Sequence, residues 1–159
     1  MDCSSKAVNP QLPGAGEVTR TLVLVVDDSE DIREALARLL RSEGYSPVGA
    51  ADAFEALAFV ATTRPALIIT DLAMPGMDGI ALVKRLKSED HTSRIPVIMF
   101  SASGGPVVDA AMAAGVDAYV LKASMDWAKL RLDVLRLAGP GVAPPVMPRV
   151  PPAVAKDAG

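Results

Sequence analysis

Short runs of apolar residues recur along the middle of the chain, separated by more polar stretches. Most of these runs are apolar at every position, which is typical of strands covered on both faces in a parallel sheet. Five such strands are predicted, over residues 22–26, 47–50, 67–70, 96–100 and 118–121. The stretches between them are long enough to hold one helix each.

Apolar residues in these intervening stretches recur at the three- and four-residue spacing of a helix face. The first predicted helix carries the stripe Ile32, Ala35, Leu36, Leu39 and Leu40, and either Asp28 or Ser29 can cap its start. The second carries Phe54, Leu57, Ala58 and Ala61, and the last carries Trp127, Leu130 and Val134. Weaker patterns predict helices over 80–87 and 107–114.

Strand and helix therefore alternate five times, which predicts an α/β fold with right-handed crossovers: a (βα)5 doubly wound parallel sheet. Pro47 lacks the N–H that a central strand would donate, so the second strand should lie at an edge. A strand order of 2-1-3-4-5 meets that condition.

The composition of the chain indicates where the predicted domain begins and ends, and it excludes several classes of protein. Of the 159 residues, 21–138 form the predicted domain, 1–20 a flexible leader and 139–159 a proline-rich disordered tail. A net charge of −3 and 4% aromatic residues argue against nucleic-acid binding. No apolar run is long enough to span a membrane, and one cysteine, Cys3, fits a reducing cytoplasm.

Polar residues follow four of the predicted strands. Asp27 and Asp28 follow the first, Asp71 the third, Ser101 the fourth and Lys122 the fifth. Ligands of open parallel sheets bind at the carboxyl ends of the strands, so these side chains should share one crevice. Three close carboxylates need a cation, and their hard oxygens favour Mg²⁺, with Mn²⁺ as the alternative. Ser101 and Lys122 suit phosphate oxygens, so the set predicts phosphoryl transfer to a carboxylate.

The same residues resemble the response-regulator receiver domain. The matching motifs are Asp27-Asp28, the segment DLAMPGMDG over 71–79, Ser101-Ala102, Tyr119 and Lys122. Successive spacings of 43, 30 and 21 residues from Asp28 to Asp71, Ser101 and Lys122 are similar to those of the family. The resemblance covers residues 22–138 and implies a flavodoxin-like fold.

The resemblance implies a role for each matching position. Asp71 would accept a phosphoryl group from a phosphohistidine on a sensor kinase. Asp28, Asp71 and the backbone carbonyl of Ala73 would bind Mg²⁺, and Asp27 would assist through a water molecule.

Signalling is implied in the same way. Ser101 and Lys122 would bind the phosphoryl oxygens, and Ser101 would act with Tyr119 as a switch. The surface formed by the fourth helix, fifth strand and fifth helix would then bind an output partner, in a monomer or a phosphorylation-induced dimer.

Two segments depart from the family pattern. Ala123 follows Lys122 where the family usually has a cis proline, and the cost of a non-proline cis bond favours a trans peptide here. Gly104, Gly105 and Pro106 follow the fourth strand and predict a mobile loop over 103–106.

The favoured interpretation is a stand-alone receiver that is not an enzyme beyond its own phosphorylation and dephosphorylation. Its partners would be a sensor histidine kinase or a histidine phosphotransfer protein, together with an unknown output protein. Three alternatives are a phosphorelay intermediate, a degenerate scaffold and a haloacid-dehalogenase-type phosphohydrolase. The last requires an acid two residues after the nucleophile, where this chain has Ala73.

Overall fold

The structure, a computed structural model, describes residues 20–124 and 126–141. Its sheet consists of the strands β2 (Leu22–Val26), β3 (Ser46–Ala50), β4 (Leu67–Thr70), β5 (Val97–Ser101) and β6 (Ala118–Leu121). The helices are α1 (Glu30–Ser42), α2 (Ala53–Thr62), α3 (Gly79–Lys87), α4 (Pro106–Ala114) and α5 (Trp127–Ala138). A 3₁₀ turn, η2 (Lys122–Ser124), joins β6 to α5. All five predicted strands are confirmed to within one residue at each end.

The strands pair in parallel in the order β3-β2-β4-β5-β6. This is the predicted order 2-1-3-4-5, and the doubly wound fold is confirmed. Pro47 lies in β3, at the edge of the sheet, as its missing N–H requires.

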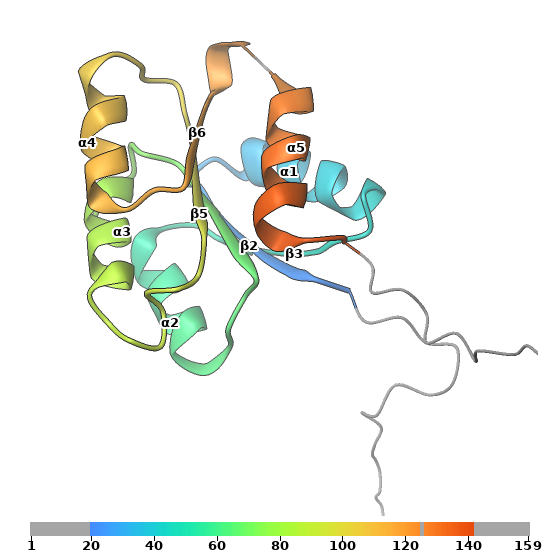
Figure 1. Ribbon diagram of the computed structural model, residues 1–159, viewed down its shortest axis with the longest axis horizontal. Coiled ribbons are helices and arrows are strands. Elements are labelled where there is room, and N and C mark those ends of the chain that lie inside the picture. Colours follow the sequence, from blue (N-terminus) through green and yellow to red (C-terminus); the bar gives the residue numbers. More distant parts are fainter. Residues whose placement is uncertain (1–19, 125, 142–159) are drawn as a thin grey trace, which may run out of the picture. The chain divides into compact units, whose positions relative to one another are not determined.

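Helices cover both faces of the sheet (Figure 1). On one face α1 and α5 pack over a core that includes Leu36, Leu40, Phe100 and Leu130. On the other face α2, α3 and α4 pack over a second core that includes Leu82. With both faces covered, β2 and β4 are buried from Val23 to Val26 and along Leu67–Thr70. Their sequences are apolar at nearly every position because both faces of these strands are buried. A strand with one exposed face would instead alternate apolar and polar residues.

The start of α1 is fixed by Ser29, which resolves the choice between the two candidate caps. The Ser29 Oγ accepts a hydrogen bond from the Ile32 backbone N–H at 3.3 Å. Asp28 is exposed and precedes this cap, so its carboxylate is not used to begin the helix.

The stripe predicted for α2 is wrong. The helix buries Ala53, Ala56 and Val60 against the core, whereas Phe54 is 57% exposed and Ala58 and Ala61 are exposed. Glu55 is the only charged residue between Ala53 and Thr62. Because the helix is apolar nearly all round, spacing alone did not identify the face that packs.

The described chain ends beside its own beginning. The Gly141 carbonyl accepts a hydrogen bond from the Thr21 N–H at 2.9 Å, and the Tyr45 hydroxyl donates to the Gly139 carbonyl at 2.6 Å. Residues 139–141 of the predicted tail are thus hydrogen-bonded to the domain. The predicted leader up to residue 19 and the tail from residue 142 lie outside the described residues. In the part of the chain that is described, no helix has the length and apolarity needed to cross a bilayer.

Candidate functional site

Three carboxylates meet at the carboxyl end of the sheet. Val26 and Thr70 are paired in the register of β2 and β4, so the residues that follow them, Asp27 and Asp71, emerge side by side. One carboxylate oxygen from each of Asp27, Asp28 and Asp71 lies within 4.8 Å of the others. This is the juxtaposition that the strand ends predict.

The carboxylates of Asp27 and Asp71 are held rigidly. Asp27 is 1% exposed, and its Oδ1 accepts a hydrogen bond from the Ser29 N–H at 2.9 Å. Asp71 is 7% exposed, and its Oδ1 accepts from the Leu72 N–H at 2.8 Å. Two buried acids with fixed geometry and one exposed acid provide hard oxygen ligands for a divalent cation.

Lys122 brings a positive charge to this acidic cluster from the end of β6. Its Nζ lies 2.9 Å from Asp27 Oδ2 and 3.4 Å from Asp71 Oδ1. The ammonium also lies 5.8 Å from the centre of the Phe100 ring, which in turn packs against Trp127 at 5.7 Å between ring centres. No peptide bond in the described residues is cis, so the bond between Lys122 and Ala123 is trans.

The electrostatics of the site oppose ionisation of Asp71. Burial raises the pKa of the Asp71 carboxyl, and the nearby charge of Asp27 raises it further, while Lys122 and the Leu72 N–H only partly offset these effects. Burial by itself would lower the pKa of Lys122, but its hydrogen bonds and ion pairs with Asp27 and Asp71 outweigh burial and raise it. The lysine is therefore held as a cation between two acids.

Ser101 and Tyr119 are linked through Ser103. Ser101, 2% exposed, ends β5, and its Oγ accepts a hydrogen bond from the Ser103 N–H at 3.1 Å. The half-buried Tyr119 donates its hydroxyl hydrogen to the Ser103 carbonyl at 2.5 Å. Ala73 is exposed in the loop after β4. The predicted mobility of residues 103–106 stays a prediction.

Comparison with known proteins agrees with this geometry. The family described as the response regulator receiver domain matches residues 23–133. The chain belongs to this family. The receiver domain is 39% identical over 107 residues to the gliding motility regulatory protein of Myxococcus xanthus, covering 67% of this chain and 14% of that protein. It is 37% identical over 122 residues to the phosphate regulon transcriptional regulatory protein PhoB of Pseudomonas aeruginosa, covering 75% and 53%.

A solved structure extends the likeness to the whole domain. The response regulator TrrA of Thermotoga maritima, crystallised with Mg²⁺ and BeF, superimposes with a TM-score of 0.67 at 31% identity. The match covers 74% of this chain and 98% of TrrA. By contrast, this receiver spans about half of PhoB and a seventh of the gliding motility protein.

Two contacts of the receiver site were not predicted, although Gly79 ends the motif over 71–79. The Arg33 Nη1 donates a hydrogen bond to the Asp27 main-chain carbonyl at 2.6 Å, from a position six residues later in α1. Gly79, at the start of α3, lies so close to β4 that a Cβ there would be 2.2 Å from the Asp71 carbonyl oxygen. Both depend on how the chain returns to the strand ends, which spacing does not reveal.

The raised pKa of Asp71 predicts that Asp71→Asn stabilises the receiver at neutral pH without divalent metal. A carboxyl whose pKa is higher in the folded state than in the unfolded chain binds protons preferentially when folded. The wild type therefore loses stability as pH rises from about 4, the ordinary aspartate value, through the folded pKa. Urea unfolding in EDTA at pH 7 should show the asparagine variant to be more stable, and this advantage should shrink towards pH 4. A less stable variant at pH 7 would contradict the prediction.

Proposed function

We propose that this receiver accepts a phosphoryl group on Asp71 from the phosphohistidine of a sensor kinase and signals through phosphorylation-dependent protein contacts. The observation that supports this most directly is the position of Lys122 between Asp27 and Asp71, with the three carboxylates within 4.8 Å. A buried acid beside a cation, with two further acids that can hold a divalent metal ion, is suited to accepting a phosphoryl group.

The chemistry assigned to Asp71 is a displacement at phosphorus. The Leu72 N–H and Lys122 contact Oδ1 of Asp71, so we assign the attack to Oδ2. A bond forms between Oδ2 and phosphorus while the bond between phosphorus and the imidazole nitrogen breaks. The electron pair stays on the imidazole. Lys122 and the Ser101 hydroxyl would then bind oxygens of the transferred group, as implied by the family.

The cluster fits a divalent metal ion. Asp28 and Asp71 are assigned as direct ligands, with the Ala73 carbonyl as a third and Asp27 acting through water. When bound, Mg²⁺ would neutralise charge on the incoming phosphoryl group. TrrA, a relative with Mg²⁺ in its crystal structure, supports Mg²⁺ as the metal.

The output is assigned to the surface of α4, β6 and α5. Among the described residues, these three elements carry four exposed large apolar side chains: Met112 at 45%, Leu121 at 38%, Leu132 at 66% and Leu135 at 51%. Tyr119, which lies in β6, and Ser101 would connect this surface to the phosphorylated site. We further propose that the protein acts in the cytoplasm as a single receiver, without turnover of a separate substrate.

The proposal is tested by intact-mass spectrometry after incubation with acetyl phosphate and Mg²⁺. The wild type should gain one phosphoryl group, and omission of Mg²⁺ should abolish the gain. Asp71→Asn, which preserves shape but removes the nucleophile, should gain none. An adduct of equal yield on the asparagine variant would overturn the assignment of Asp71. A folded wild type that gains no adduct from acetyl phosphate or from phosphorylated kinases would overturn the proposed function.

A further inference from the structure

Arg33 connects three elements around the acidic cluster. From the second turn of α1 its Nη1 donates to the Asp27 carbonyl at 2.6 Å. Its Cδ and Nε lie 3.3 and 3.6 Å from the position that a Cβ on Gly49 would occupy in β3. The absence of a side chain at Gly49 thus leaves the space through which Arg33 reaches Asp27.

This contact completes the restraint of Asp27. Its N–H donates to the Ala50 carbonyl at 3.1 Å, and its carboxylate is held by Ser29 and Lys122 at 2.9 Å each. The Asp27 carbonyl and the Asp28 N–H belong to one planar peptide unit. By fixing that carbonyl, Arg33 also fixes the direction in which the backbone of Asp28 leaves the strand. Asp28 is the exposed member of the cluster and needs this restraint most.

We propose that Arg33 is a positioning residue for the divalent-cation site, an inference that rests on the proposed function. Two effects of Arg33 on a bound cation oppose each other. Its charge repels the ion, whereas its hydrogen bond to the peptide of Asp27 and Asp28 preorders two ligands. The guanidinium contacts the Asp27 main-chain carbonyl and none of the three carboxylates, so the hydrogen bond acts directly on the ligand backbone. The ordering of Asp27 and Asp28 therefore outweighs the repulsion between Arg33 and the cation. Hydrogen bonds that support metal ligands in this way change metal affinity by roughly 10-fold or more.

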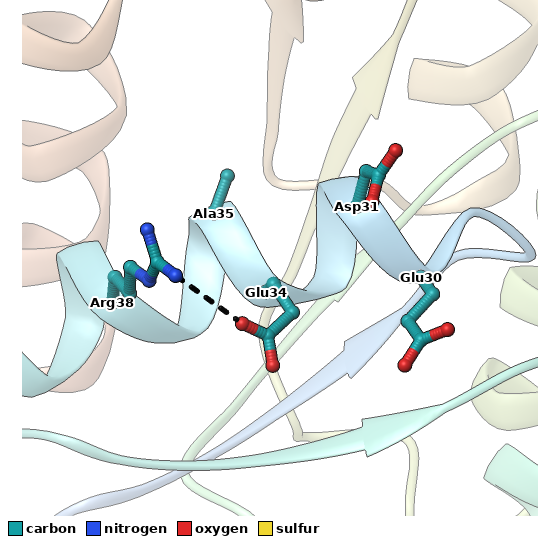
Figure 2. Close-up of a pocket in the computed structure, with 5 residues that line it drawn as sticks. All are labelled: Glu30, Asp31, Glu34, Ala35 and Arg38. Carbon is teal, nitrogen blue, oxygen red and sulfur yellow. Dashed lines mark ion pairs between the residues drawn. The ribbon is translucent and has the colours of Figure 1, made fainter.

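The test measures Mg²⁺ binding to the full chain by isothermal titration calorimetry. Arg33→Met keeps an apolar stem over Gly49 but removes the donor, and should raise the Kd for Mg²⁺ about tenfold. Arg33→Lys restores one donor and should recover part of the affinity. Arg38→Met is the matched control: Arg38 lies on the same helix, its side chain is 79% exposed, and it pairs with Glu34 at 3.7 Å (Figure 2). It should leave the Kd unchanged.

A second readout separates positioning from general damage. At Mg²⁺ concentrations that saturate each protein, Arg33→Met should be phosphorylated by acetyl phosphate at the wild-type rate. Gly49→Ala keeps the arginine but places a Cβ 3.3 Å from its Cδ, so the side chain must shift by a few tenths of an ångström, and Mg²⁺ binding should weaken less than in Arg33→Met. This variant tests the inference even if Arg33→Met does not fold.

The possible results distinguish the positioning role of Arg33 from the proposed function of the receiver. An unchanged or tighter Kd in Arg33→Met, or an equal loss in Arg38→Met, would overturn the role of Arg33 and leave the proposed function standing. A slower reaction at saturating Mg²⁺ would show that Arg33 does more than position the ligands. A wild type that binds no Mg²⁺ would instead overturn the proposed function.

Discussion

Replacing Lys122 with methionine is expected to destabilise the domain by about 3 kcal/mol at pH 7 when no divalent metal is present. The substitution leaves Asp27 and Asp71 facing each other, 1% and 7% exposed, without the cation that lies 2.9 and 3.4 Å from them. Removing one partner of a buried ion pair costs about 3–5 kcal/mol, and the 19% exposure of the lysine side chain favours the lower end.

Urea unfolding in EDTA measures this loss, and its pH dependence identifies the cause. The pKa of Asp71 is raised, and protonation of this carboxyl relieves its repulsion from Asp27, so the loss should diminish as pH falls towards 4. Mg²⁺ should restore more stability to Lys122→Met than to the wild type, because it replaces a missing positive charge. Lys84→Met, at an exposed position of α3, is the matched control. Equal small effects of both substitutions would show that the ion pair contributes nothing to stability.

Gly79→Ala is expected to cost about 3 kcal/mol and to impair the site as well. A Cβ at residue 79 would lie 2.2 Å from the Asp71 carbonyl oxygen and 3.0 Å from the Leu72 Cα. These are backbone atoms that cannot rotate away. The Gly79 N–H also donates to the Leu72 carbonyl at 2.7 Å, so relief of the overlap must move the segment that carries Asp71.

Chemical denaturation and the mass test for phosphorylation together measure both effects. Gly104→Ala provides the matched control, because the same added methyl group would lie 3.4 Å from a side-chain carbon of Leu121, an ordinary contact. It should change stability by less than about 0.5 kcal/mol. A Gly79→Ala protein with wild-type stability would mean that α3 can shift without disturbing β4.

The sequence predicted the acidic cluster well because its geometry follows from strand ends alone. Once Val26 and Thr70 are buried strand residues of a parallel sheet, Asp27 and Asp71 have little freedom in where they emerge. Lys122 is predicted by the same reasoning, since it follows β6 directly. The positions of these three residues can be predicted once the strand bounds and the strand order are known. The apolar runs predict the strand bounds, and Pro47 helps to predict the order.

The remaining features depend on contacts that periodicity does not encode. In α2 nearly every position is apolar, so the exposure of Phe54 and the burial of Ala56 come from packing rather than pattern. The helical pattern of α1 predicts only that Arg33 is a surface residue. Its contact with Asp27 depends on Gly49, which has no side chain and so leaves room for the arginine. The link between Ser101 and Tyr119 through Ser103 likewise depends on the conformation of a loop.

The pairing of Lys122 with both acids has a thermodynamic consequence. In the receiver at rest, the ammonium that would hold a phosphoryl group already pairs with Asp27 and Asp71, two of the three carboxylates of the cluster. A cation that takes over these acids would release the lysine for the incoming group, and the incoming group would release the acids for the cation. Binding linkage requires these two effects to be equal in size. Metal affinity and the equilibrium for phosphorylation of Asp71 are therefore coupled, and a substitution at Lys122 that changes this coupling would change both.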